Sequence, residues 1–101
     1  MGQRKYPPLT PMEIIAIIIA RGFSLHHTGG DHKYYYREVR GEKRVLQVDT
    51  GSPLYSDHYL KLVITESGMS REEFYCSTKS TAKKINLACA SDEELLNWAL
   101  A

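Results

Sequence analysis

"FSLHHTGGDHKYYYREVRGEKRVLQVD", residues 23 to 49, is the stretch that decides the fold. Two turns interrupt it, one at Thr28-Gly29-Gly30-Asp31 and one at Arg40-Gly41-Glu42, where glycine supplies the positive φ of a tight hairpin. The segments between them, residues 23–27, 32–39 and 43–49, are rich in the aromatic and β-branched residues typical of strands. The pattern predicts a three-stranded antiparallel meander.

Helix signals lie on both sides of this stretch. Thr10-Pro11-Met12-Glu13 combines a capping box with proline at the first helical position, and Gly22 marks the end of that helix. Ser56 is expected to cap a second helix, DHYLKLVITES, which Gly68 closes. Helix, three strands and helix predict an α+β domain, with an antiparallel sheet covered on one face by two helices.

The remaining residues are predicted to form a tail. Residues 70–73 make a second capping box, which opens a short turn carrying Phe74, and the polar residues 77–84 have the composition of a linker. Residues 91–94 make a third capping box and start a C-terminal helix. We therefore divide the chain into a domain at 1–75 and a linker with a helical tail at 76–101. The apolar residues of the tail fold back over the domain or meet another molecule; they are Leu95, Leu96, Trp98 and Leu100.

Size and composition exclude several classes of protein. With 101 residues and a net charge of +1, the chain has a modest core and no overall excess of basic residues. Its longest apolar run, residues 14–20, is far shorter than the roughly 20 residues of a membrane span. Cys76 and Cys89 do not make a disulfide framework, and nothing in the sequence indicates export. A cytoplasmic protein is expected.

A metal site is the first chemistry to consider for the turn region. His26, His27, Asp31 and His32 are potential nitrogen and oxygen ligands. However, no pair of them has a recognised ligand spacing, and adjacent residues of a strand such as His26 and His27 should point to opposite faces. We expect neither a metal nor a cofactor.

RNA cleavage through the 2′-hydroxyl is the second activity that the residues of the turn region could support. It needs a base, an acid and cations, and histidine suits the proton transfers because it titrates near neutrality. His32 follows the Gly-Gly turn, where backbone can approach a phosphate closely. Because strand side chains alternate, at least one tyrosine of residues 34–36 faces outward and could stack on a base. The basic residues that could contact the RNA backbone are Lys33, Arg37, Arg40 and Arg44. The same pattern is equally expected without any activity, because a histidine at a strand end is often only a surface residue and tyrosines are common in strands.

The order of these motifs resembles the HicA-type (YcfA-like) toxins, which are small metal-independent mRNA interferases. "PMEIIAIIIARGFSLHHTGGDHKYYY" is similar to the first half of the family pattern, with Gly30-Asp31-His32 in place of Gly-Ser-His and Tyr35 at the usual aromatic position. "YLKLVITESGMSREEF" is similar to the second half. The resemblance covers about residues 11 to 75.

The resemblance implies a fold like a double-stranded RNA-binding domain, cleavage of mRNA as the activity, and a HicB-type antitoxin as partner. It places the catalytic general acid/base at His32, and RNA as the substrate gives the basic and aromatic residues near it an expected role as an RNA-binding surface. The residues expected on that surface are Gly30, Lys33, Tyr35, Arg37, Arg40 and Arg44. No metal or other cofactor is implied.

Two departures from the family pattern bear on activity. Asp31 puts a carboxylate where the family has a small hydroxyl residue, and TGSPLYSDHY replaces a lysine-rich approach to the last helix. A carboxylate beside the histidine favours its charged form and repels phosphate. A non-catalytic RNA- or protein-binding module with the same fold is therefore the alternative. In a purely interacting protein, the first helix or the C-terminal helix would form a homodimer or partner interface.

Overall fold

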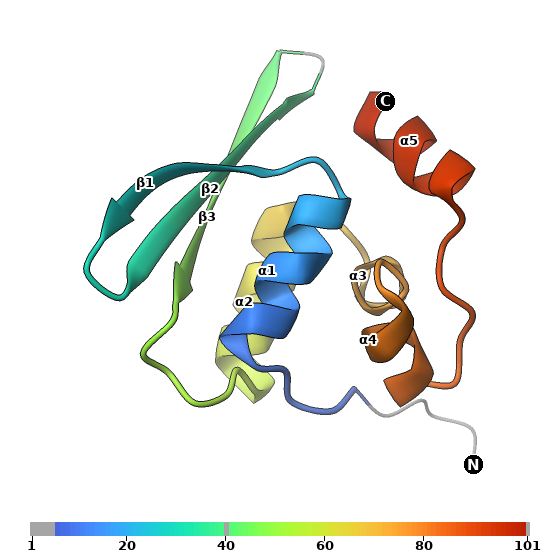
Figure 1. Cartoon of the computed structure of the whole chain (residues 1–101), viewed down its shortest axis with the longest axis horizontal. Coiled ribbons are helices and arrows are strands. Elements are labelled where there is room, and N and C mark those ends of the chain that lie inside the picture. The colour runs from blue at the N-terminus through green and yellow to red at the C-terminus, as the bar shows by residue number, and fades with distance from the viewer. Residues whose placement is uncertain (1–5, 40, 101) are drawn as a thin grey trace.

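A computed structural model of the chain describes residues 6–39 and 41–100, without the side chains of Val39, Leu96, Trp98, Ala99 and Leu100. The predicted α+β class is confirmed (Figure 1). The elements follow one another as α1 (Pro11–Ala20), β1 (Ser24–Gly29), β2 (His32–Val39), β3 (Glu42–Asp49), α2 (Asp57–Ser67), α3 (Arg71–Tyr75), α4 (Lys79–Lys84) and α5 (Asp92–Leu100).

The three strands form the predicted antiparallel meander, in the order β1-β2-β3. β2 and β3 pair without interruption from His32 opposite Asp49 to Val39 opposite Glu42. β1 pairs with β2 in a register that shifts between Leu25 and His27. Such a bulge places one extra residue on the bulged strand and locally changes which way its side chains point. The residues affected by this bulge are His26 and His27.

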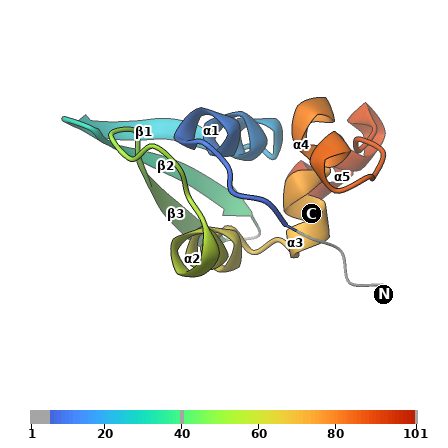
Figure 2. The same ribbon diagram turned by 90° about the horizontal axis from the view of Figure 1, so that it is seen from below.

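The core lies on one face of the sheet. Tyr35, Leu46 and Val48 point to this inner face and are buried together with the apolar residues of the helices. α1 contributes Ile14, Ile15, Ile17 and Ile18, and α2 contributes Leu60, Val63 and Ile64. Both helices therefore pack on the inner face, with α2 beside β3 (Figure 2). The opposite, outer face of the sheet carries the alternate residues of each strand.

The predicted helix starts are confirmed by their hydrogen bonds. The three predicted capping boxes are present, with reciprocal bonds between Thr10 and Glu13, between Ser70 and Glu73, and between Ser91 and Glu94. Ser56 occupies the cap position of α2 but makes no side-chain cap bond. Gly68 closes α2 with a φ of 81°, a left-handed conformation that glycine adopts without steric cost.

The predicted linker at residues 77–84 is wrong. Residues 79–84 form α4, which Thr78 caps, and the adjoining Ile85 belongs to the core. The Thr81 hydroxyl donates to the carbonyl oxygen of Tyr75 at 2.7 Å. Lys84 Nζ reaches Glu13 of α1 at 2.9 Å. Polar residues thus fix this segment to the domain because their polar groups find partners inside it.

Buried Arg21 makes a further link across the domain. Its Nε donates to Ser77 Oγ at 2.8 Å, and its Nη2 donates to the carbonyl oxygen of Glu73 at 3.1 Å. Arg21 is only 4% exposed, so these bonds offset part of the cost of burying its charge. The end of α1 is thereby tied to α3 and to Ser77, which follows it.

Tyr75 gives the fold a predicted sensitivity to alkali. Its ring is fully buried, its hydroxyl donates to the carbonyl oxygen of Pro7, and burial, with smaller contributions from Glu13 and Tyr6, raises its pKa to about 12. The unfolded chain releases this proton near the ordinary tyrosine pKa of about 10. The contribution of Tyr75 to stability is therefore complete below pH 10 and is lost as the pH rises toward 12.

We expect Tyr75→Phe to flatten this alkaline loss, and to cost about 1 kcal/mol at pH 8 because the bond to Pro7 is removed. Urea denaturation of both proteins at pH 8, 10 and 11 measures the difference. An equal fall in unfolding free energy for both between pH 10 and 11 would contradict the assignment to Tyr75.

Candidate functional site

His32 stands at the first position of β2, directly after the hairpin turn. Gly30 in that turn has a φ of 60°, and a side chain added to it would meet no atom within 4 Å. His32 lies opposite Asp49, the last residue of β3. Its Nε2 is 3.9 Å from Asp49 Oδ2, and the two side chains are 47% and 41% exposed. The pair is thus open to solvent and within reach of a bound molecule.

Asp49 is held in place by its neighbours. Its Oδ1 accepts the backbone N–H of Gly51 at 2.9 Å, and its own N–H donates to the hydroxyl of Tyr55 at 2.7 Å. Two hydrogen bonds from the loop therefore fix both the backbone and the carboxylate. A carboxylate held in this way places a fixed negative charge 3.9 Å from the imidazole of His32.

Asp31 brings a second carboxylate to this region. A Cβ added at Gly51 would lie 2.8 Å from Asp31 Oδ2 and 3.3 Å from Asp49 Oδ1, so both carboxylates face the same glycine. The carbonyl oxygen of Asp31 also accepts the N–H and the hydroxyl of Thr50, at 2.7 and 2.9 Å. The loop after β3 is therefore tied to the turn before β2, and the surroundings of His32 are acidic.

A groove of about 470 Å³ opens beside this pair, between the end of β3 and α2. Its apolar wall includes Leu54, Tyr59 and Leu62, which are 51%, 68% and 46% exposed. Its polar wall consists of His32, Gln47, Asp49, Ser52 and Glu66. The groove thus combines a titratable pair with exposed apolar surface, as ligand-binding sites commonly do.

Two of the residues predicted to contact RNA are buried. Tyr35 and Arg37 point to the inner face and are only 4% and 7% exposed, so neither offers a ring or a guanidinium to RNA. Alternation along β2 puts them on the face opposite His32. The resemblance identified an aromatic position, but that position belongs to the core.

The other residues predicted to contact RNA lie in different parts of the domain. Lys33 is partly buried on the inner face, and Gly30 is exposed in the turn. Arg44 donates to the carbonyl oxygen of Glu66 at 3.3 Å and to Glu42 at 3.2 Å, so it holds α2 against β3. Arg40 lies outside the described residues. Among the described residues, Lys33, Arg37 and Arg44 therefore do not form the predicted basic surface around His32.

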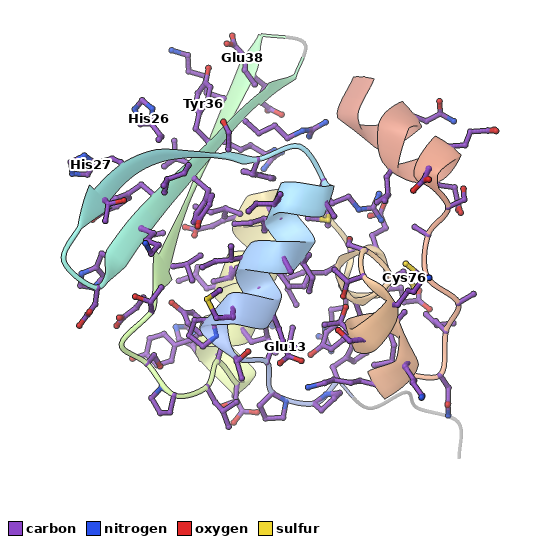
Figure 3. The ribbon with its side chains drawn as sticks, viewed as in Figure 1. Glu13, His26, His27, Tyr36, Glu38 and Cys76 are labelled. Carbon is purple, nitrogen blue, oxygen red and sulfur yellow. The ribbon has the colours of Figure 1, made fainter. Side chains whose placement is uncertain are left out.

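The prediction that His26 and His27 point to opposite faces is also wrong. The rings of His26 and Tyr36 are 5.7 Å apart, and those of His27 and Tyr34 are likewise 5.7 Å apart. Tyr34 and Tyr36 alternate with Tyr35 and so lie on the outer face. The bulge in β1 turns both histidines toward that face, away from α1 (Figure 3).

Asp49 is the site residue that sequence reasoning missed, although the signal was available. An unbulged hairpin around Arg40-Gly41 pairs residues equally distant from the turn, and His32 and Asp49 are each eight residues from it. The histidine pair had no such signal, because a bulge cannot be located from alternation alone. Within the part of the chain that the structure describes, no three metal-ligating side chains gather at one point.

Comparison with known proteins does not identify a family for this chain. No protein-family model matches the chain, no curated protein matches it significantly, and neither does any solved structure. Among residues 6–39 and 41–100, no helix has both the length and the apolar character needed to cross a bilayer.

Proposed function

We propose that the chain is a HicA-like, toxin-type domain with a fold like a double-stranded RNA-binding domain, which binds RNA and cleaves mRNA without a metal. The observation that supports this most directly is His32, half-exposed beside the groove with the fixed carboxylate of Asp49 3.9 Å away. The order α1-β1-β2-β3-α2, with both helices on the inner face, agrees with the proposed fold. The activity belongs to the cytoplasm, where mRNA is present.

In this mechanism His32 acts as the general acid/base. The neutral imidazole takes the proton of the ribose 2′-hydroxyl, and the 2′-oxygen forms a bond to phosphorus. The bond from phosphorus to the 5′-oxygen breaks, and the 5′-oxygen receives the proton from the imidazolium. The products are a 2′,3′-cyclic phosphate and a 5′-hydroxyl. The Asp49 carboxylate, 3.9 Å from Nε2, provides a negative charge beside the imidazolium that forms between the two proton transfers.

The proposal is tested with purified protein and single-stranded RNA in the presence of a chelator. Cleavage is expected to continue, with products that end in 2′,3′-cyclic phosphate, because the imidazole performs both proton transfers. Mass spectrometry of the fragments identifies the ends. Loss of cleavage on chelation, or products with a 5′-phosphate, would contradict the mechanism.

A non-catalytic RNA- or protein-binding module is the second candidate, and the acidic surroundings of His32 favour its protein-binding form. Asp31, Asp49 and Glu66 all lie around the groove or the adjoining turn, where they repel a phosphate. The same carboxylates suit a basic segment of a partner such as a HicB-type antitoxin. Binding of RNA that weakens with added salt but leaves the RNA intact would favour the module over the nuclease.

A purely interacting role would use another surface. α1 exposes Met12 and Ile19, which are 67% and 54% accessible and lie on the side of the helix away from the core. They give the proposed homodimer or antitoxin contact a place on the first helix. The side chains of α5 that would form the alternative contact, Leu96, Trp98 and Leu100, lie outside the described residues.

A further inference from the structure

We infer that the outer face of the sheet binds unpaired bases of single-stranded RNA, one base on each of two histidine–tyrosine pairs. The two pairs are His27 with Tyr34 and His26 with Tyr36. The inference rests on the proposed function, because it specifies the form of RNA that the His32 site accepts.

The two pairs present ring surface to solvent. Both histidines are exposed and both tyrosines are partly exposed, although the tyrosines lie in the middle strand of the sheet. The ring planes within each pair are inclined by 37° and 38°, so each pair forms a shallow, tilted step. Aromatic side chains on an open sheet stack unpaired bases, and they do so with little dependence on base identity.

The pairs also lie in line with His32. Strand alternation puts His32, Tyr34 and Tyr36 on the same face of β2, with successive side chains about 6.8 Å apart along the strand. Their partners on β3 are Asp49, Gln47 and Val45. An extended RNA strand whose bases rest on the two tyrosines therefore continues directly to the proposed catalytic pair.

Apart from Val45 opposite Tyr36, the neighbours of the rings on this face are polar or charged, which favours RNA over an apolar protein segment. Gln47 beside Tyr34 offers a hydrogen-bonding amide, and Lys43 lies opposite Glu38 at the far end of the face. The Tyr36 hydroxyl donates to Glu38 at 2.8 Å, which fixes the outer ring. The face thus combines stacking surface with polar edges. A base paired in a duplex cannot stack on it, so the site discriminates against duplex RNA.

The test measures binding separately from cleavage. A fluorescent single-stranded oligoribonucleotide is titrated with His32→Ala protein, so that the RNA stays intact, and the same strand is then titrated as a duplex. Single-stranded RNA is expected to bind at least roughly tenfold more tightly. Adding Tyr34→Ala and Tyr36→Ala should weaken single-strand binding by roughly tenfold for each ring. Tyr34→Phe keeps the ring face and the bond between Tyr36 and Glu38, so it should bind as before.

Variants of the exposed histidines test the same site even if the tyrosine variants do not fold. His26→Ala with His27→Ala should weaken binding several-fold, whereas His58→Ala, an exposed histidine of α2, should not. In addition, His32→Ala protein crosslinked to RNA containing 5-iodouridine should carry the label on residues 26–36.

The outcomes separate this inference from the proposed function. Three results would overturn the inference, although cleavage by His32 could still stand. They are equal affinity for duplex and single-stranded RNA, an affinity unchanged by both the tyrosine and the histidine alanine variants, and crosslinks confined to α1 or α2. Tight, ring-dependent binding by a protein that never cuts RNA would support the inference and contradict the proposed cleavage. Absence of any RNA binding, or binding of a peptide alone, would contradict both.

Discussion

His32→Ala is expected to lower the rate of RNA cleavage by about 10²- to 10⁴-fold, the range that one positioned general acid/base contributes. The imidazole is the proposed carrier of both proton transfers, and alanine leaves no group at that position to replace it. Growth inhibition on expression in bacteria should disappear with it. The rate is measured under single-turnover conditions on a single-stranded oligoribonucleotide.

The fold should survive this substitution. The His32 side chain is 47% exposed and meets Asp49 only at 3.9 Å, so the free energy of unfolding should stay within about 0.5 kcal/mol of wild type. His58→Ala is the matched control, because it removes an exposed histidine of α2 that does not line the groove. Undiminished cleavage by a folded His32→Ala protein would exclude His32 as the catalytic residue.

Ile85→Ala is expected to destabilise the protein by about 2 to 4 kcal/mol, through lost burial and the cavity left behind. Ile85 is only 3% exposed and belongs to the same core as the sheet and α1. For a domain of this size the loss corresponds to a fall in melting temperature of about 10 °C or more. Thermal and urea denaturation followed by circular dichroism measure both quantities.

Ile19→Ala provides the comparison, since it makes the same chemical change at a side chain that is 54% exposed. Its effect should stay within about 0.5 kcal/mol. If the two variants melt together, the residues that follow α3 do not belong to the core, and the original division of the chain at residue 75 would regain support.

Most of the sheet could be predicted because its signals are local. Alternation, two glycine turns and runs of tyrosine and valine specify strands between residues 24 and 49 without reference to the rest of the chain. The capping boxes fix helix starts for the same reason, since each depends on two residues three apart. α4 was missed because KSTAKK carries no apolar periodicity. Its buried members are Thr81 and Ala82, and Thr81 is held by a hydrogen bond to the carbonyl oxygen of Tyr75 in α3.

The candidate site shows the same division. His32 was identified from the Gly-Gly turn and the family resemblance, both of which are features of consecutive residues. Tyr35 was assigned to RNA by the resemblance, but the register of β2 turns it into the core, where it lies opposite Leu46. The direction of a strand side chain depends on which face is covered, and covering requires the helices to be placed.

By itself, the sequence determined the positions of the three strands and of α1, α2 and α5, the two turns and the residue that stands at the start of β2. Only the tertiary structure decided which side of β2 is buried, that the bulge turns His26 and His27 to the same face, and that the acids Asp31 and Asp49 converge on Gly51. The physical reason is the distance along the sequence over which each interaction acts. Caps, turns and alternation act over a few residues, whereas burial, register shifts and the meeting of charges depend on segments far apart in the chain.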